Sequence, residues 1–135
     1  TMGSIYKDAD IVSLHIPLTE ETTYLVDTNF ISKFRKDIYL INTARGKCIN
    51  TKHLAKAINN GKIKGACLDV LEYEKISFEN LHTEGIANEI QYLKTAKNTI
   101  LSPHIAGWTN ESNIMISRVL LEKITHLLTK NLKIK

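Results

Sequence analysis

Four short apolar runs in this 135-residue sequence are each followed by side chains that could carry out chemistry. The second run is followed by Arg45, and the fourth is followed by His104. Three carboxylates, Asp69, Glu72 and Glu74, follow the third run. A fixed guanidinium can hold an anionic substrate, and a histidine paired with a carboxylate can transfer a proton. These residue types predict a catalytic site, provided that the fold brings the ends of the runs together.

The apolar runs have the character of buried strands in a parallel sheet, because they are short and most do not alternate strictly. They cover residues 10–16, 38–42, 65–70 and 99–102. Helical spacing of apolar residues recurs in the stretches 27–34, 50–65, 88–98 and 109–130. Thr109 can cap the last of these, and Asn-Asn-Gly at 59–61 is a natural stop. The alternation predicts an α/β fold with a parallel, doubly wound sheet and a long C-terminal helix.

Ligands of such sheets bind beyond the carboxyl ends of the strands, where the residues listed above converge. The first run ends near His15 and Pro17, which join this edge. Simpler interpretations exist for each residue: Arg45 could pair with a surface carboxylate, the acidic residues could be solvated, and His104 could serve a turn. Convergence after successive strands favours the catalytic interpretation. The remaining histidines, His53, His82 and His126, are interpreted as having no catalytic role.

Composition narrows the class of protein. The net charge is +4, but no basic stripe is interleaved with aromatic residues, which argues against a nucleic-acid partner. The longest apolar runs are too short to span a membrane, and the first residues do not resemble a secretory signal. Cys48 and Cys67 lack metal-ligand spacing and are expected to be reduced core residues. We therefore expect a cytoplasmic protein without a metal site.

Three stretches resemble the signatures of the D-isomer-specific 2-hydroxyacid dehydrogenases, the family of phosphoglycerate dehydrogenase and D-lactate dehydrogenase. Their order and spacing fit, with 29 residues from Arg45 to Glu74 and 30 from Glu74 to His104. Residues 9–26 resemble the segment that precedes the signatures. The three stretches are NTARG (42–46), GACLDVLEYE (65–74) and SPHIAG (102–107).

The resemblance implies a role for each central residue. Arg45 would hold the substrate carboxylate and polarise the carbonyl, while His104 would exchange the hydroxyl proton as hydride is transferred. Glu74 would hydrogen-bond His104 and favour its imidazolium form, with Glu72 as the competitor for that role. Asp69 would accept from the nicotinamide carboxamide. The cofactor-binding set implied is His15, Pro17, Thr43, Ala44, Arg45, Asp69, His104, Ala106 and Gly107.

The sequence departs from the family pattern at two places. Lys75 stands where the family usually has a proline. The dinucleotide fingerprint G-x-G-x-x-G is nowhere in the sequence. The resemblance therefore implies that residues 1–135 are the C-terminal portion of a Rossmann-like nucleotide-binding domain. The first βαβ unit and most of the substrate domain would lie before residue 1. NAD is the expected cofactor, and NADP stays open because the discriminating acidic residue would also lie upstream.

The expected function is hydride transfer between NAD and a D-2-hydroxy acid, by an oxidoreductase of which this chain alone is inactive. Trp108 and the segment 72–98 favour a phosphoglycerate-like substrate. The alternative is a binding or assembly module derived from the same fold, which would not need Arg45, Glu74 and His104. The expected partners are a small 2-hydroxy or 2-oxo acid and further copies of the chain, because bare apolar faces and a bare strand edge favour association.

Overall fold

The structure is a computed structural model that describes residues 1–73 and 86–132. The chain divides into two compact units, Thr1–His104 and Ile105–Lys135, and each is described by itself.

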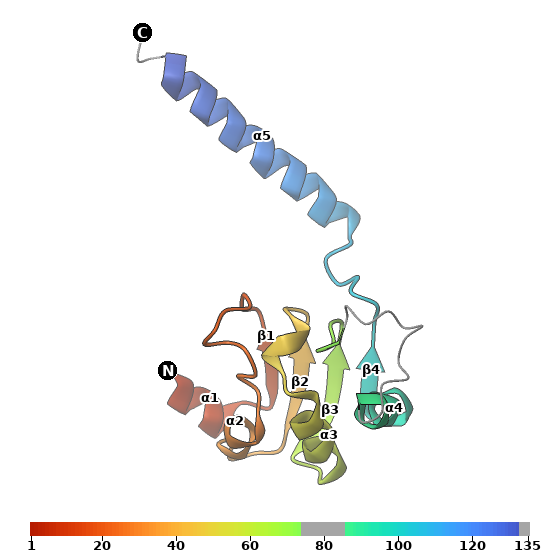
Figure 1. The fold of residues 1–135 in the computed structure, drawn as a ribbon. Coiled ribbons are helices and arrows are strands. Elements are labelled where there is room, and N and C mark those ends of the chain that lie inside the picture. The colour runs from red at the N-terminus through yellow and green to blue at the C-terminus, as the bar shows by residue number, and fades with distance from the viewer. Residues whose placement is uncertain (74–85, 133–135) are drawn as a thin grey trace. The chain divides into compact units, whose positions relative to one another are not determined.

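Four parallel strands form a single sheet in the first unit, in the order β1-β2-β3-β4 (Figure 1). The strands are β1 (Ile11–Leu14), β2 (Ile38–Asn42), β3 (Ile63–Leu68) and β4 (Thr99–Leu101). All four overlap the predicted runs, and the parallel α/β fold class is confirmed. Strand β3 begins two residues earlier than predicted. The helix expected over 50–65 therefore ends earlier than predicted, at Asn59. The turn at Gly61, where φ is +81°, separates helix from strand.

Helices connect the strands of this unit in alternation. They are α1 (Met2–Asp8), α2 (Thr28–Ser32), α3 (Thr51–Asn59) and α4 (Ile86–Thr95), with a 3₁₀ turn, η1 (Gly46–Cys48), before α3. Sequence patterning predicts α2, α3 and α4 but misses α1. Helix α1 has no buried residue of its own. Its Tyr6 ring packs edge-to-face on Phe30 and Phe34, with centroid separations of 5.6 and 5.0 Å, and this aromatic contact anchors the helix.

Side-chain caps fix where α2 and α3 begin. Oδ1 of Asp27 accepts a 2.7 Å hydrogen bond from the N–H of Phe30, and Oδ1 of Asn50 accepts a 3.1 Å bond from the N–H of His53. Each cap satisfies a backbone donor that the helix leaves unpaired, a contribution of about 1 kcal/mol. The position of α3 matters for function, because this helix begins directly after the turn that carries Arg45.

The core lies between the sheet and the helices that cover one of its faces. Helix α3 packs on β3, with α2 and α4 beside it (Figure 1). Side chains of both layers are fully buried there, among them Ile38, Leu40, Ile63, Leu54 and Leu93. Burial of one such side chain contributes about 1.5–3 kcal/mol. The prediction of buried strands is therefore confirmed for β2 and β3. It was wrong for β1 and β4, in which Leu14 is the one buried residue, because helices of the described residues cover one face of the sheet.

The opposite face of the sheet is apolar and exposed. Ile11 pairs with Tyr39 across the first two strands, and these side chains are 61% and 49% exposed. Ile100 pairs with Cys67 and is 67% exposed. Cys48 is buried as expected, but Cys67 is only half-buried because it lies on this second face, so the prediction that both cysteines are core residues was wrong for Cys67. Both thiols are free.

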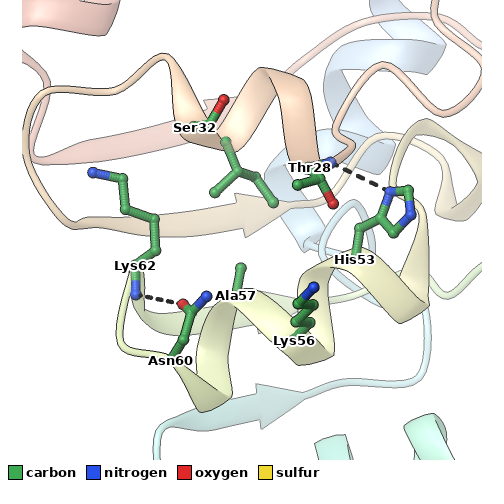
Figure 2. A pocket seen from close by; sticks show the side chains of 8 residues that line it. Thr28, Ser32, His53, Lys56, Ala57, Asn60 and Lys62 are labelled. Atoms are coloured by element: carbon green, nitrogen blue, oxygen red, sulfur yellow. Dashed lines mark hydrogen bonds between the residues drawn. The ribbon is translucent and has the colours of Figure 1, made fainter.

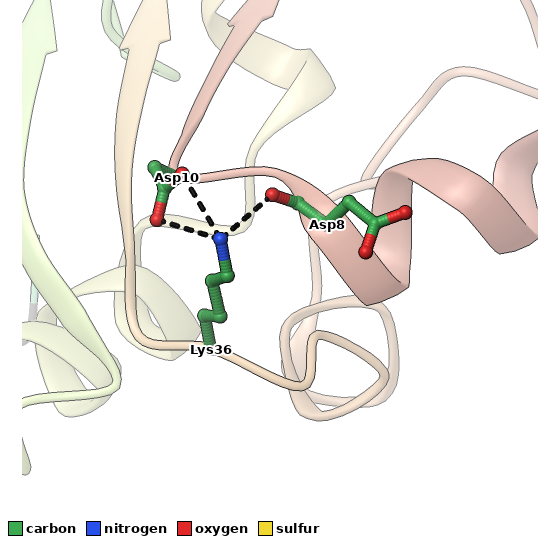
Figure 3. Close-up of polar contacts among 3 residues, drawn as sticks. All are labelled: Asp8, Asp10 and Lys36. Carbon is green, nitrogen blue, oxygen red and sulfur yellow. Dashed lines mark hydrogen bonds and ion pairs between the residues drawn. The ribbon is translucent and has the colours of Figure 1, made fainter.

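Lys36 ties the start of β1 to the segment that leads into β2 (Figure 3). Its Nζ lies 3.0 Å from both carboxylate oxygens of Asp10 and 3.0 Å from the carbonyl oxygen of Asp8. The side chains are exposed, so the ion pair contributes less than about 1 kcal/mol and serves mainly to set register.

The second unit is dominated by helix α5 (Asn110–Leu132). Oγ1 of Thr109 accepts a 3.0 Å hydrogen bond from the N–H of Ser112, as the predicted cap requires. The predicted apolar side of α5 is exposed, with exposed fractions between 39% and 63% at Ile116, Val119, Leu120, Ile124 and Leu127. In the part of the chain that the structure describes, no helix combines the length and hydropathy needed to cross a membrane.

Candidate active site at the carboxyl edge of the sheet

The predicted site residues of the first unit follow four adjacent strands at the same edge of the sheet (Figure 1). His15 follows β1, Arg45 follows β2, Asp69 follows β3, and His104 comes three residues after β4. Because the strand order equals the chain order, Asp69 lies between Arg45 and His104 along the edge. The structure thus places the four residues after adjacent strands, in the order His15, Arg45, Asp69 and His104 along the edge.

A buried amide shapes the turn that carries Arg45. Asn42, which is 0% exposed, accepts a 3.0 Å hydrogen bond from the N–H of Ala44 through Oδ1. Its Nδ2 donates a 3.0 Å bond to the carbonyl of Arg45. Thr43 and Ala44 are thereby held in a tight turn, and the guanidinium of Arg45 donates a 2.7 Å bond to the carbonyl of Ala44. Sequence reasoning missed Asn42, although a polar residue ending a buried run is the signal that identifies it.

The Arg45 turn also lies against the loop after β3. A Cβ placed on Gly46 would lie 1.9 Å from the carbonyl oxygen of Leu71, so only glycine fits there. The N–H of Asp69 donates a 3.0 Å hydrogen bond to the carbonyl of Asn42. The second and third loops at this edge are therefore in direct backbone contact.

Asp69 is a buried carboxylate, with 5% of its surface exposed. Oγ of Ser102 donates a 2.6 Å hydrogen bond to its Oδ1. The carbonyl of Asp69 accepts a 2.9 Å bond from the N–H of His104. A short hydrogen bond to a carboxylate is among the stronger ones in proteins. Ser102, which sequence reasoning also missed, thus links the two loops that carry Asp69 and His104.

His104 has an uncommon backbone conformation. Its φ is +56°, in the left-handed region that residues other than glycine seldom adopt, at a cost of about 1–2 kcal/mol. The side chain is exposed at the edge of the sheet. The hydrogen bond from its N–H to Asp69 helps to hold this conformation. The backbone of His104 therefore joins the loop after β4 to the loop after β3.

His15 and Pro17 begin the loop after β1. Nε2 of His15 lies 2.8 Å from Oγ of Ser13, and the carbonyl of Pro17 accepts a 2.7 Å hydrogen bond from Oγ1 of Thr22. Both residues are exposed at the same edge as the Arg45 turn.

The structure describes one of the two carboxylates predicted as partners of His104. Glu74 lies outside the described residues. Glu72 is described, and its Oε2 accepts a 3.0 Å hydrogen bond from the N–H of Thr51, at the start of α3. It lies near the phenol groups of Tyr24 and Tyr73 and raises the pKa of both. The carboxylate of Glu72 thus contacts the start of α3, and this contact does not support Glu72 as the partner of His104.

Ala106 and Gly107 belong to the second unit, which is described by itself. A Cβ built on Gly107 would have no atom within 4 Å, so nothing in the described residues crowds that position.

A cavity of about 100 Å³ lies elsewhere in the first unit, between α2 and α3 (Figure 2). His53 borders it, and Nδ1 of this ring accepts a 3.3 Å hydrogen bond from the N–H of Thr28. Lys56 and Lys62 also border the cavity. None of the predicted site residues that the structure describes is among its lining. His53 therefore connects α3 to the start of α2.

The residues at the carboxyl edge fit the nicotinamide end of a dinucleotide. The carboxylate of Asp69, fixed by Ser102, is an acceptor suited to the N–H groups of a carboxamide. In the neighbouring turn, Thr43 is half-buried, Ala44 is buried and Arg45 is exposed. The pyrophosphate is a different matter, because the sequence contains no glycine-rich turn of the kind that binds it.

Known proteins with similar sequences are dehydrogenases and reductases of 2-oxo acids. An aromatic 2-oxoacid reductase from Clostridium sporogenes is 34% identical over 114 residues, which are 83% of this chain and 34% of that protein. A glyoxylate reductase from Thermofilum pendens is 39% identical over 111 residues, covering 82% of this chain and 30% of that one. The chain thus spans about a third of the length of the curated relatives it matches.

The solved structures agree. D-lactate dehydrogenase from Aquifex aeolicus, in complex with NAD and lactic acid, has a TM-score of 0.74 and 34% identity, covering 98% of this chain and 41% of that one. A D-2-hydroxyisocaproate dehydrogenase has a TM-score of 0.77 and 28% identity, covering 96% and 40%. The family described as "D-isomer specific 2-hydroxyacid dehydrogenase, NAD binding domain" matches residues 1–106. The chain therefore belongs to the D-isomer-specific 2-hydroxyacid dehydrogenases, in the NAD-binding domain of that family.

Proposed function

We propose that the chain serves an NAD-dependent oxidoreductase that interconverts a D-2-hydroxy acid and the corresponding 2-oxo acid. The observation that carries this proposal is the row formed by Arg45, Asp69 and His104 after three adjacent parallel strands. Each of the three lies in one of the family's motifs, and hydrogen bonds join the loops that hold them. A pure binding module has no physical need for this combination of charges.

The reaction follows from the chemistry of these groups. Arg45 binds the substrate carboxylate with its planar guanidinium and polarises the adjacent C2 oxygen. In the oxidation direction, His104 accepts the hydroxyl proton as the C2–H bond breaks. Bound NAD supplies the acceptor for the hydride that leaves C2. In the reduction direction, protonated His104 returns the proton to the C2 oxygen. Glu74 favours the imidazolium that this direction requires.

Cofactor binding is assigned to the residues along the same edge. Asp69 accepts from the carboxamide, while the remaining residues of the set line the ring and its ribose: His15, Pro17, Thr43, Ala44, Ala106 and Gly107. We propose that residues 1–135 form the C-terminal portion of the NAD-binding domain. Because the sequence lacks the glycine-rich pyrophosphate turn, the 135-residue chain by itself binds NADH weakly and turns over little. Tight, saturable binding in an NADH fluorescence titration of the isolated chain would contradict this assignment.

The substrate is a small 2-hydroxy or 2-oxo acid. The names of the relatives support lactate-like, aromatic and glyoxylate-like acids, while Trp108 and the segment 72–98 were the reasons to expect a phosphoglycerate-like acid. All four classes contain the carboxylate that Arg45 would bind. Activity measured with a panel of these acids therefore shows which substrate side chain is preferred, and the shared carboxylate lets the same reaction be followed with each acid.

Copies of the chain are expected to associate. Ile11, Tyr39 and Ile100 leave an apolar sheet face exposed, and parallel sheets are normally covered on both faces. Analytical sedimentation at high protein concentration tests this directly, since a clean monomer would argue against association.

The test of the function uses the protein at the mass its own cells produce, which an immunoblot compares with 15.3 kDa. NADH formation is followed with the D and L isomers of lactate, phenyllactate and glycerate 3-phosphate. We expect turnover with a D isomer and none with its L isomer. Absence of turnover with every acid, together with intact NADH binding, would support the alternative of a non-catalytic module.

A further inference from the structure

Glu72 lies where three segments of the chain meet. Its Oε2 accepts from the N–H of Thr51, at 3.0 Å, in the first turn of α3. The phenol groups of Tyr24, in the loop after β1, and of Tyr73, its neighbour in sequence, lie near the same carboxylate, which raises the pKa of both. An ionised carboxylate only accepts, and its two oxygens have room for about four donors. Glu72 is thus suited to hold several donors at once.

The segments that Glu72 joins are the ones on either side of the Arg45 turn. Thr51 comes six residues after Arg45, and the intervening turn η1 lies against the loop of Glu72. Tyr24 is attached to the same turn, because its N–H donates a 2.8 Å hydrogen bond to the carbonyl of Lys47. The residue after next, Val26, donates a 3.0 Å bond to the carbonyl of Cys48. The residues after Arg45 are therefore bordered by two loops that meet at Glu72.

Tyr24 shows that this arrangement is held under some strain. Its φ is +55°, in the left-handed region that an aromatic residue rarely adopts. Such a conformation persists when neighbouring contacts determine it. The neighbouring contact is its backbone hydrogen bond to the carbonyl of Lys47, and its phenol lies near the carboxylate of Glu72.

We propose that Glu72 is a positioning residue for Arg45: its carboxylate fastens the start of α3 to the loop after β3, on either side of the Arg45 turn, and so fixes the guanidinium relative to Asp69. The role of Arg45 itself rests on the proposed function, but the anchoring of its turn does not. Glu72 and Glu74, two residues apart, then have separate tasks. Glu72 acts on substrate binding through Arg45, whereas Glu74 acts on proton transfer through His104.

The two tasks predict different kinetics. Glu72→Gln keeps one acceptor oxygen but loses the charge, and Glu72→Ala loses both. We expect the KM for the 2-oxo acid to rise about tenfold in Glu72→Ala and less in Glu72→Gln, with a smaller change in kcat and an unchanged pH profile. Glu74→Gln should instead alter the pH profile. A shifted pH profile in Glu72→Gln, or an unchanged KM in Glu72→Ala, would overturn the positioning role.

Amide hydrogen exchange tests the anchor without any turnover. In Glu72→Ala, we expect the amides of Thr51, Tyr24 and Cys48 to exchange at least about tenfold faster, because the opening of these contacts becomes easier. Glu122→Gln, an exposed carboxylate on α5, is the matched control and should leave these amides unchanged. If exchange is unaffected in Glu72→Ala, the anchor does not exist. If exchange rises but no variant or wild type turns over any acid, the proposed function fails while the anchor stands.

Discussion

The hydroxyl of Ser102 and the carboxylate of Asp69 are joined by a 2.6 Å hydrogen bond between two different family motifs. Ser102 follows β4 and Asp69 follows β3, so the bond spans neighbouring strands at the carboxyl edge. The same two loops also share the bond from the N–H of His104 to the carbonyl of Asp69. Two hydrogen bonds thus connect the loop that carries a buried carboxylate to the loop that carries an exposed imidazole.

Removing the Ser102 hydroxyl should therefore destabilise the protein. Ser102→Ala withdraws a donor from a carboxylate that is 5% exposed, so we expect the free energy of unfolding to fall by about 1.5–3 kcal/mol. Urea denaturation measures the difference. Ser32→Ala is the control, because that hydroxyl bonds an exposed carbonyl and its loss should cost less than about 0.5 kcal/mol. Equal effects of the two changes would show that the Ser102 bond contributes no special stability.

Gly46 should not accept any side chain. The Cβ of Gly46→Ala would meet the carbonyl oxygen and carbon of Leu71 at 1.9 and 2.1 Å, and both are backbone atoms that cannot rotate away. We expect the melting temperature to drop, with a loss of about 2 kcal/mol or more, since the Arg45 turn must separate from the loop after β3.

Gly3→Ala provides the matched control for this change. Gly3 lies in helix α1, and the nearest side-chain atom to its added Cβ, Oγ1 of Thr1, is 3.9 Å away. Alanine is the better helix former, so this variant should be neutral or slightly more stable. A Gly46→Ala protein that melts like Gly3→Ala would mean that the two loops are not in contact in solution.

We expect the protein to lose stability in alkaline solution, because the pKa values of two tyrosines are raised in the folded state. Burial, followed by the charge of Glu72, raises the pKa of Tyr73 from 10.0 to about 12. The hydrogen bond to Glu72, followed by burial, raises the pKa of Tyr24. In the unfolded chain both phenols titrate near their ordinary value of about 10. The stabilisation is therefore complete below pH 10 and is lost as the pH rises towards about 12.

Denaturation curves recorded across this pH range measure the loss. Tyr73→Phe should flatten part of the decline, because phenylalanine does not titrate. Tyr39→Phe changes a half-exposed ring on the open sheet face and should leave the decline as it is. An identical decline of the free energy of unfolding in the wild type, Tyr73→Phe and Tyr39→Phe would contradict the raised pKa of Tyr73.

The strands and most helices could be predicted because their signals are local. Apolar runs mark β1 to β4, Asp27, Asn50 and Thr109 cap their helices, and Gly61 ends α3. The same locality explains the miss at α1, whose stability comes from the packing of Tyr6 on rings more than 20 residues away.

The supporting residues of the site were harder to predict than the site itself. Arg45 and His104 follow strands and lie in recognisable motifs, so their placement at one edge follows from parallel topology. The role of Glu72 depends on its nearness to Thr51, 21 residues earlier, and that of Ser102 on Asp69, 33 residues away. No sequence periodicity encodes such contacts, because they arise only when neighbouring loops meet.

We propose that His104 transfers the proton in the reaction of a D-2-hydroxyacid dehydrogenase. The most direct measurement is single-turnover NADH oxidation by the wild type, His104→Ala and His104→Asn, with NADH binding measured in parallel. Asparagine tolerates the left-handed backbone at this position, so His104→Asn changes the chemistry with the least disturbance of the loop. We predict a loss of about 10²- to 10⁴-fold in rate in both variants, with NADH still bound. Unchanged rates in both would remove His104 from the mechanism.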